Sequence, residues 1–366
     1  MYDVIIVGAG PAGATLARLI GGERSVLLVE RRNVSGTSGG QTREKCCGGL
    51  LAPDARAMLT RFGLALPEWV RDSGQPLAVR ALDLVSGRSR RYPRPYINME
   101  RPTFERWLLS LLPGRVEVGE GRRFVSAARL EGGAGWTVRL DGSAGEGVEQ
   151  CRMLVGADGA DSLVRRLVAD SPVCASRYLA VQDVFCRDAV SGISGGEYLA
   201  FFHPGVTDFY GWVIPKRERV LLGIALPPAR QGGRSVPELL HTVRASLEGR
   251  GMAFGKKGER QACMVLRPTP GDVFAGRAGV FCIGEAAGCI SPSSAEGFSY
   301  AFRSAGMLAE TMLCEEDPER ILAGYAWKMR RLRLNIALKR MKARVMFSPF
   351  LRAAVMRSGI LAARDA

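Results

Sequence analysis

The hydrophobic pattern at the start of the chain predicts a βαβ unit. Residues 2–7 are mostly apolar, as in a short strand that is buried on both faces. A glycine-rich turn follows, then a helix over about 11–21 and a second apolar strand over 25–30. The polar, glycine-rich residues 31–50 predict a long loop. This succession is typical of the first half of a nucleotide-binding sheet.

The pattern further along alternates between helices, a strand meander over 115–140 and a β-rich region from about 175 to 265. Helices are expected over about 53–63, 101–112, 235–249 and 296–314, and the basic residues beyond about 318 also have a helical pattern. Strands are expected over 151–156, 178–187, 197–203, 208–215, 219–226 and 279–284.

These shifts predict an α/β protein with two domains and a tail. The chain has 366 residues, which suits two cores better than one. We assign 1–75, 96–172 and 266–316 to a discontinuous Rossmann-like domain. Residues 76–95 and 173–265 form an inserted α+β domain with an antiparallel sheet, which we expect to bind the substrate. Residues 317–366 form a basic helical C-terminal segment.

The turn after the first strand has the spacing Gly8-x-Gly10-x-x-Gly13. The first glycine makes the tight turn, the second lets a pyrophosphate approach the backbone, and the third lets the helix pack on the strand. The helix N-terminus then faces the phosphates with free N–H groups. Glu30 ends the second strand, where a carboxylate can accept a hydrogen bond from a ribose hydroxyl. Glycine turns alone are common, but this one, in register with both strands and the acid, predicts a dinucleotide site.

Charge and cysteine content narrow the possible partners. Lys and Arg exceed Asp and Glu by 51 to 36, a net charge of +15. This excess fits an anionic partner and equally fits an enzyme from an arginine-rich proteome. No recognition motif for nucleic acid accompanies it. The 9 cysteines include no C-x-x-C pair, and with only 2 histidines they argue against a disulfide framework or a metal site.

The redox state and the N-terminus predict a cytoplasmic location. Reduced thiols fit a cytosolic protein better than a secreted one. The chain enters a strand at once, without the basic and apolar regions of a signal peptide. No apolar run is long enough to span a bilayer.

Two later turns distinguish FAD from NAD. One is a Gly-Ala-Asp-Gly segment with Ala157 and Asp158, and the other is a strand-to-helix turn with Gly284 and Glu285. In this order they resemble the flavoprotein monooxygenases of the p-hydroxybenzoate hydroxylase superfamily. That superfamily has Asp at the second turn, where it contacts the ribityl and pyrophosphate region of FAD, and Glu285 is one methylene longer. Arg101, at a helix start, matches the superfamily's arginine that reaches toward FAD.

The resemblance narrows to the geranylgeranyl reductase family, and within it to the CbrA-type bacterial members. Residues 47–49 are similar to that family's Cys-Gly-Gly segment. Residues 210–215 (Tyr-Gly-Trp-Val-Ile-Pro), with Gly223, resemble its Tyr-x-Trp-x-Phe-Pro…Gly signature, with Ile in place of Phe. Residues 292–298 resemble its segment after the second turn. The resemblance covers nearly the whole chain and implies a GR2-type FAD-binding domain.

The resemblance also implies a set of site residues. Gly297 and Phe298 would turn the N-terminus of the 296–314 helix toward the flavin, although an ordinary helix cap would use the same residues. The residues expected to bind FAD are Gly8, Gly10, Pro11, Ala12, Gly13, Glu30, Arg31, Cys47, Gly48, Gly49, Leu50, Arg101, Phe124, Ala157, Asp158, Gly284, Glu285, Gly297 and Phe298.

The implied reaction reduces C=C bonds of an isoprenoid or other prenyl lipid by hydride transfer from reduced flavin. The second carbon of the bond then needs a proton. Cys47 is the leading donor, because a thiol is mostly protonated at neutral pH, and Tyr210 is the second. The alternative for Cys47 is simple packing in its loop. Tyr210, Trp212 and Pro215 would line the substrate tunnel, or else form an ordinary aromatic sheet core.

Other functions stay open at this point. The same fold could carry a monooxygenase of the aromatic-hydroxylase type, or a flavin-bearing lipid-binding protein at the membrane. A single dinucleotide fingerprint means that the reductant, NAD(P)H or a reduced carrier protein, binds transiently. Residues 320–366 hold twelve Lys or Arg against one acid, Asp365. They predict either a peripheral helix on the anionic inner membrane surface or a docked helix with a solvated polar face.

Overall fold

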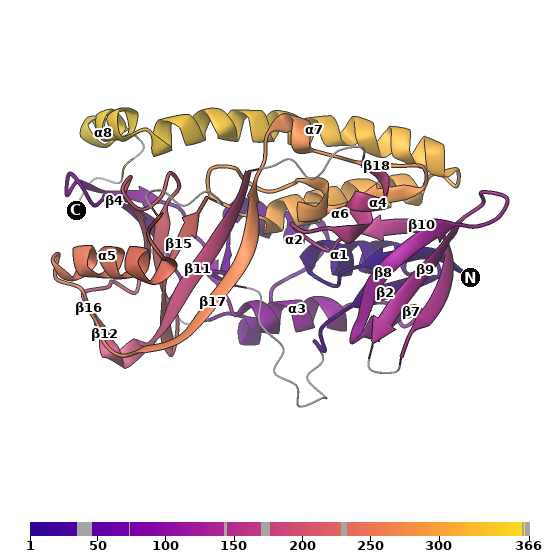
Figure 1. The fold of residues 1–366 in the computed structure, drawn as a ribbon, viewed down its shortest axis with the longest axis horizontal. Coiled ribbons are helices and arrows are strands. Elements are labelled where there is room, and N and C mark those ends of the chain that lie inside the picture. Colours follow the sequence, from indigo (N-terminus) through magenta and orange to yellow (C-terminus); the bar gives the residue numbers. More distant parts are fainter. Residues whose placement is uncertain are drawn as a thin grey trace.

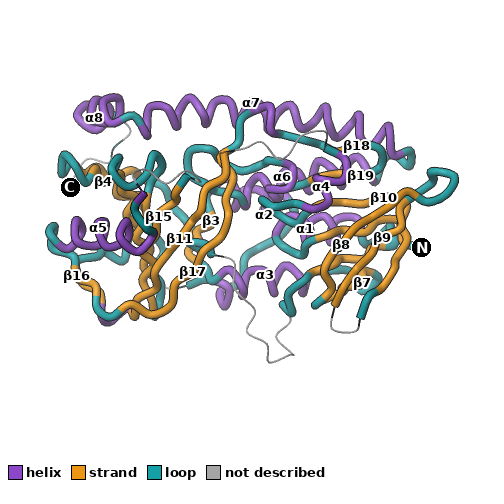
Figure 2. Tube along the Cα trace, in the orientation of Figure 1, coloured by secondary structure: helices purple, strands orange, loops and turns teal. Residues whose placement is uncertain are grey.

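The structure is a computed structural model that describes residues 1–34, 46–72, 74–142, 145–169, 176–227, 233–360 and 362. Two sheets lie side by side, and the long helix α7 (Pro318–Phe347) runs along one edge of the molecule past both of them (Figure 1). Figure 2 shows the same arrangement by element type, with helices between and outside the sheets. The predicted α/β class and helical C-terminal segment are confirmed.

The first sheet is built around parallel strands that are apolar without alternation. Its order is β18-β19-β10-β1-β2-β7. These strands are β1 (Tyr2–Val7), β2 (Val26–Glu30), β7 (Val116–Glu120), β10 (Gly147–Gly156), β18 (Gly276–Arg277) and β19 (Val280–Cys282). All neighbours pair in parallel except β18 with β19. Such strands need cover on both faces, which explains why the sequence shows continuous apolar runs.

Different layers cover the two faces of this sheet. On one face lie α1 (Pro11–Ile20), α6 (Phe298–Met312) and the first part of α7, which share one hydrophobic core with the strands. On the other face lie β8 (Arg122–Arg129) and β9 (Trp136–Gly142), which form an antiparallel meander with β10. The meander predicted over 115–140 was wrong for its first part, because residues 116–120 form β7 and pair in parallel with β2. Three shorter helices, α2 (Pro53–Arg61), α3 (Arg101–Ser110) and α4 (Leu163–Val168), complete this half of the molecule.

The second sheet has the order β17-β11-β15-β14-β13-β4-β5, with only the β13–β4 pair parallel. Helix α5 (Val236–Glu248) covers one of its faces, and the opposite face lines a cavity between the two sheets. The strands are β4 (Ala78–Asp83), β5 (Ser89–Pro93), β11 (Ser176–Cys186), β13 (Glu197–Phe202), β14 (Gly211–Pro215), β15 (Arg219–Leu226) and β17 (Lys257–Arg267). Two small two-stranded sheets pair β3 (Leu50–Leu51) with β6 (Ile97–Asn98) and β12 (Val190–Ser191) with β16 (Ala253–Phe254).

The strands expected over 178–187, 197–203 and 219–226 are confirmed as β11, β13 and β15. The strand expected over 208–215 begins only at Gly211. β17 was not predicted, because its first half is polar and charged, with Lys257, Glu259 and Arg260. It is an edge strand with β11 as its neighbour, so that half needs no apolar residues.

Helix α7 and the following α8 (Pro349–Ser358) join the two sheets. The Tyr325 hydroxyl donates to the Cys282 carbonyl in β19 at 2.9 Å. At the other end, Arg352 forms a buried ion pair with Asp83 of β4 at 2.7 Å. Burial opposes ionisation of Asp83, but the N–H of Ser86 and the Arg352 guanidinium outweigh it and hold the pKa of the carboxyl below its usual range. Among the described residues, no helix is long and apolar enough to cross a membrane.

Candidate active site

Three glycines shape the turn between β1 and α1, each in a different way. Gly8 has φ +104°, and a Cβ there would lie 2.5 Å from the Ala157 carbonyl oxygen. A Cβ on Gly13 would lie 1.9 Å from the Gly8 carbonyl oxygen, so this glycine allows close packing of the helix. A Cβ on Gly10 would meet nothing within 4 Å. The open space at Gly10, before an α1 first turn without acidic residues, fits a pyrophosphate.

A chain of alternating charges leads away from the end of β2. The buried Glu30 carboxylate accepts hydrogen bonds from the Ala9 N–H (3.0 Å) and from Arg32 Nε (3.0 Å). Arg32 also donates to Glu105 (3.0 Å), which accepts from Arg101 Nε (2.8 Å). Burial disfavours the Glu105 carboxylate, but Arg101 and Arg32 outweigh it and lower its pKa. Arg32 was missed from the sequence, although its place beside Glu30 was the available signal.

The two acids of the later turns have different surroundings. Asp158 Oδ2 accepts from the N–H groups of Leu163 (2.7 Å) and Val164 (3.3 Å) and so caps α4. Its Oδ1 is buried without a partner among the described residues, and burial raises the pKa of Asp158. A ligand hydroxyl in the cavity would satisfy this oxygen. Glu285 Oε1 accepts from the Leu266 N–H at 3.0 Å, so the longer side chain reaches β17.

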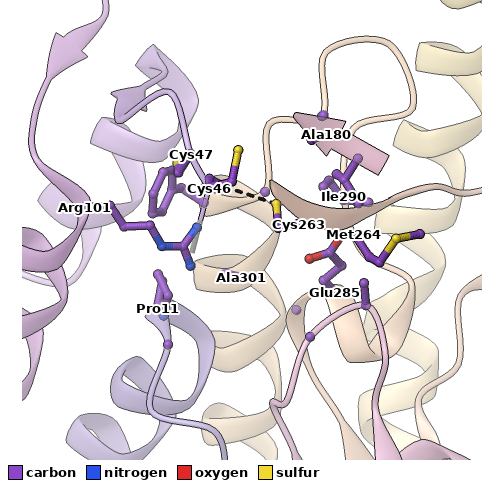
Figure 3. Close-up of a pocket in the computed structure, with 18 of the residues that line it drawn as sticks. Pro11, Cys46, Cys47, Arg101, Ala180, Cys263, Met264, Glu285, Ile290 and Ala301 are labelled. Carbon is purple, nitrogen blue, oxygen red and sulfur yellow. Dashed lines mark hydrogen bonds between the residues drawn. The ribbon is translucent and has the colours of Figure 1, made fainter. Parts of the chain in front are cut away.

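The Cys-Gly-Gly loop is held by its own backbone and by two neighbouring segments. Gly49 has φ +64°, its N–H donates to Cys47 Sγ (3.3 Å), and its carbonyl accepts from the Met99 N–H (2.8 Å). Cys263 Sγ donates to the Cys46 carbonyl at 3.2 Å, and the contact between the two cysteines, together with burial, raises the pKa of the Cys46 thiol (Figure 3). The loop therefore has a defined place at the cavity wall.

Lys216 lies buried beneath this loop. Its ammonium donates to Asn98 Oδ1 (2.5 Å), the Met99 carbonyl (2.9 Å) and the Gly49 carbonyl (3.4 Å). Burial lowers the pKa of Lys216 to about 8, so it is charged at neutral pH. The sequence interpretation did not include Lys216, although it directly follows the 210–215 signature.

Tyr210 and Trp212 form part of an aromatic wall. Tyr210 directly precedes β14, so the strand expected over 208–215 does not include it. The rings of Tyr210 and Trp212 meet edge to face, with centroids 6.1 Å apart. The Tyr210 hydroxyl donates to the Ser294 carbonyl at 2.7 Å, and Trp212 Nε1 donates to Gln182 Oε1 at 3.1 Å. Burial raises the pKa of Tyr210, which keeps its hydroxyl protonated.

The N-terminus of α6 lies at the same cavity. Gly297 is its N-cap, and no side-chain hydrogen bond caps the helix there. The Arg101 guanidinium carbon lies 5.7 Å from the centroid of the Phe298 ring. The preceding Glu296 accepts a hydrogen bond from the Tyr96 hydroxyl at 2.5 Å. Tyr96 and Glu296 both line the cavity and were not predicted, because they are 200 positions apart in the sequence.

These features surround one cavity of 1470 Å³. One small-molecule pocket typically occupies about 300–1,000 Å³, so this cavity has room for two ligands. Figure 3 shows the Arg101 guanidinium between the Cys46–Cys47 segment and Pro11, with Glu285 and Met264 on the other wall. Of the predicted site residues, Gly13 and Pro215 do not line the cavity, and Ile214 lines it instead of Pro215. The predicted residues that line it are Gly8, Gly10, Pro11, Ala12, Glu30, Arg31, Cys47, Gly48, Gly49, Leu50, Arg101, Phe124, Ala157, Asp158, Tyr210, Trp212, Gly284, Glu285, Gly297 and Phe298.

Comparison with known proteins places the chain in a family. No family model matches it. Protein CbrA of Escherichia coli O157:H7 is 37% identical over 361 residues, which cover 98% of this chain and 97% of that protein. The chain belongs to the CbrA family. The predicted relationship to CbrA-type proteins is therefore confirmed.

Solved structures show the fold. A geranylgeranyl bacteriochlorophyll reductase-like protein from Thermoplasma acidophilum superposes with a TM-score of 0.79 at 17% identity, over 97% of this chain and 90% of that one. PqsL from Pseudomonas aeruginosa, described as a probable FAD-dependent monooxygenase, gives 0.68 at 20% identity, over 97% and 99%. This CbrA-family chain thus has the fold of FAD-dependent oxidoreductases. FAD is the cofactor of that fold, and the open space at Gly10 and the unpaired Asp158 Oδ1 fit it.

Proposed function

We propose that this chain is an FAD-dependent reductase that saturates C=C bonds of an isoprenoid lipid. The observation that carries the proposal is that one cavity is lined both by the glycine turn and by a group of apolar side chains, most of them from the second sheet. Burial of apolar surface against such walls is favourable by about 25 cal/mol per Å², which suits a hydrocarbon chain. The apolar members of this lining are Ala180, Tyr198, Phe209, Tyr210, Trp212, Ile214, Met264, Val265 and Ile290, and Glu259, Gln261 and Glu296 line the same cavity.

The residues at the cofactor end would bind and orient FAD. When bound, FAD supplies the redox chemistry, taking two electrons from a reductant and giving them to the substrate. Gly10 and the α1 N-terminus would hold the pyrophosphate, and Asp158 Oδ1 would accept from a cofactor hydroxyl. Arg101 and the α6 N-terminus at Gly297 would favour negative charge on the reduced ring.

Cys47 is the better proton donor of the two candidates. The Tyr210 hydroxyl already donates a hydrogen bond to the Ser294 carbonyl, so its O–H is engaged away from a substrate. The Cys47 sulfur instead accepts from the Gly49 N–H and also contacts the Arg101 guanidinium, so among the described residues these contacts use its lone pairs and not its S–H. We therefore assign proton delivery to Cys47, and the aromatic wall with Tyr210 and Trp212 to substrate orientation and water exclusion.

The reductant and the location follow from the substrate class. With one dinucleotide fingerprint in the sequence, NAD(P)H or a reduced carrier protein would bind transiently. An isoprenoid lipid resides in a membrane, so we place the reaction at the cytoplasmic face of the inner membrane. Residues 1–75, 96–172 and 266–316 would hold FAD, and residues 76–95 and 173–265 would hold the lipid.

A monooxygenase of the aromatic-hydroxylase type is the second candidate. The aromatic wall favours it, because rings such as Phe209 and Tyr210 also suit a planar substrate. Its fold neighbour PqsL is described as a probable FAD-dependent monooxygenase. The two candidates differ in one requirement, since hydroxylation consumes oxygen and saturation does not.

Anaerobic reoxidation of the reduced flavoprotein separates these functions. The holoprotein is reduced with dithionite without oxygen, and a geranylgeranyl lipid or a phenolic substrate is added. Reoxidation by the prenyl lipid alone supports the reductase. Reoxidation only after oxygen is admitted, with a hydroxylated phenol as product, contradicts it and supports the monooxygenase. Tight lipid binding without any reoxidation contradicts both and leaves a flavin-bearing lipid-binding protein.

A further inference from the structure

Helix α7 has two apolar faces, and the fold covers only one of them. The buried face consists of Ile321, Tyr325, Met329, Leu332 and Ile336, which are at most 1% exposed. At about 100° per residue, Leu332 and Leu334 project about 200° apart. The outer stripe, on the opposite side, consists of Trp327, Leu334, Leu338, Met341 and Val345, with exposed fractions of 60%, 63%, 56%, 63% and 37%.

The outer stripe is a continuous surface feature. Its members follow one another at intervals of seven, four, three and four residues, so they form one ridge about 27 Å long. Figure 1 shows α7 along an outer edge of the molecule, with both sheets on the same side of it. Phe350, 80% exposed, follows at the start of α8. Single exposed apolar residues are normal, but a ridge of this kind marks an interaction surface.

The charged residues that α7 and α8 carry alongside the outer stripe are all cations. From residue 320 to residue 360 the sequence has eleven Lys or Arg and no Asp or Glu. By helical spacing, exposed Arg330 and Arg344 flank the stripe on one side and exposed Arg331 on the other. The apolar stems of these arginines can lie along the stripe while their charged ends reach outward.

We propose that the outer stripe and its flanking arginines dock the protein onto the surface of an anionic phospholipid bilayer. The stripe would enter the boundary between headgroups and acyl chains, and the arginines would contact the phosphates. A second copy of this chain fits the surface poorly, because pairing two stripes would bring together arginines from a span, residues 320–360, that has no acid of its own. The proposal does not depend on which reaction the cavity supports.

Vesicle co-sedimentation of the purified full-length holoprotein tests the proposal. Vesicles of phosphatidylcholine alone are compared with vesicles that also contain phosphatidylglycerol. The stripe variant Leu334→Ser/Leu338→Ser/Met341→Ser should bind the anionic vesicles roughly a hundredfold more weakly than the unmodified chain. The charge variant Arg330→Gln/Arg331→Gln should lose on the order of tenfold.

The matched control removes exposed apolar residues elsewhere. Val85→Ser/Val148→Ser changes two side chains that are 67% and 62% exposed, one in the turn between β4 and β5 and one on β10. It should bind vesicles as the unmodified chain does. Urea unfolding of every variant should match the unmodified chain, which shows that lost binding is not lost folding. Trp327, next to the bilayer in the docked state, should be quenched by brominated lipid, and Trp327→Phe should lack that quenching.

Three results would overturn the proposal. The first is absence of binding to anionic vesicles, and the second is equal binding to both vesicle types. The third is that the unmodified chain is a dimer in solution and the stripe variant is a monomer. The assay requires no substrate or turnover. A failure here therefore leaves the reductase proposal standing, and a failure of the reductase assay leaves this proposal standing.

Discussion

Replacing Gly49 by alanine tests whether the Cys-Gly-Gly loop is packed as tightly as the structure shows. Gly49 and Gly63 have nearly the same backbone angle, φ +64° and +70°. A Cβ on Gly63 would meet nothing within 4 Å. A Cβ on Gly49 would lie 2.1 Å from the Met99 carbonyl oxygen and 2.4 Å from Lys216 Nζ. The Gly63→Ala variant therefore measures the cost of the backbone angle alone.

The two costs can be worked out separately. Alanine in the left-handed region costs about 1–2 kcal/mol, and the stiffer unfolded chain offsets about 0.4–1 kcal/mol. Gly63→Ala should thus lower the free energy of unfolding by about 1 kcal/mol. In Gly49→Ala the Met99 carbonyl and Lys216 must also move apart, which loses a charged hydrogen bond of about 1.5–3 kcal/mol. The total for Gly49→Ala is about 2.5–4 kcal/mol.

Urea unfolding of both variants, with flavin content measured by absorbance, checks this difference. Gly63→Ala should retain FAD at the level of the unmodified chain. Gly49→Ala should be less stable than Gly63→Ala by at least about 1.5 kcal/mol and should show a shifted flavin spectrum, because the loop lines the cavity. Equal stability of the two variants would refute the packing of this loop against Lys216 and Met99.

Three further outcomes are expected. Lys216 keeps its proton up to about pH 10.5 in the unfolded chain but only up to about pH 8 in the folded chain. The free energy of unfolding should therefore rise by about 1.4 kcal/mol per pH unit between these two values. In urea unfolding of Lys216→Met, measured over the same pH range, this rise should be missing. Cys47→Ala should keep FAD but lose at least tenfold in prenyl-lipid turnover, while the adjacent Cys46→Ala should retain turnover; equal rates for both would remove Cys47 from the reaction. Asp83→Asn leaves Arg352 buried and unpaired and should lower the unfolding free energy by about 3–5 kcal/mol, and a loss below 1 kcal/mol would contradict the buried pair.

The parts of the fold that sequence could predict have a local signal. The apolar run of β1, the glycine turn at residues 8–13 and the apolar run of β2 stand next to one another, and the structure confirms all three. β17 has no such signal, because its first residues, Lys257 and Glu259 among them, are exposed, and pairing with β11 makes this edge segment a strand. Whether such a segment becomes a strand depends on its pairing with a strand that is distant in the sequence, and no local pattern carries that information.

The candidate site divides in the same way. The motif residues Gly10 and Asp158 lie in short segments that carry their own spacing, and both line the cavity. Lys216 and Tyr96 act through partners that are distant in sequence, 118 positions away for Asn98 and 200 for Glu296. Their roles follow only from the packing of distant segments, the end of β14 against β6 and Tyr96 against the loop before α6. From the sequence alone, a buried lysine that follows an apolar strand looks the same as a solvent-exposed lysine at the end of a strand.

The most direct test of the proposed function is the composition of the product. The holoprotein, a reductant and a geranylgeranyl lipid are incubated without oxygen, and a parallel sample receives ¹⁸O₂ with a phenolic substrate. The reductase account predicts that the lipid gains two hydrogen atoms per double bond in the oxygen-free sample and that no ¹⁸O enters any product. An unchanged lipid, together with a phenol that has gained one ¹⁸O atom, would contradict it.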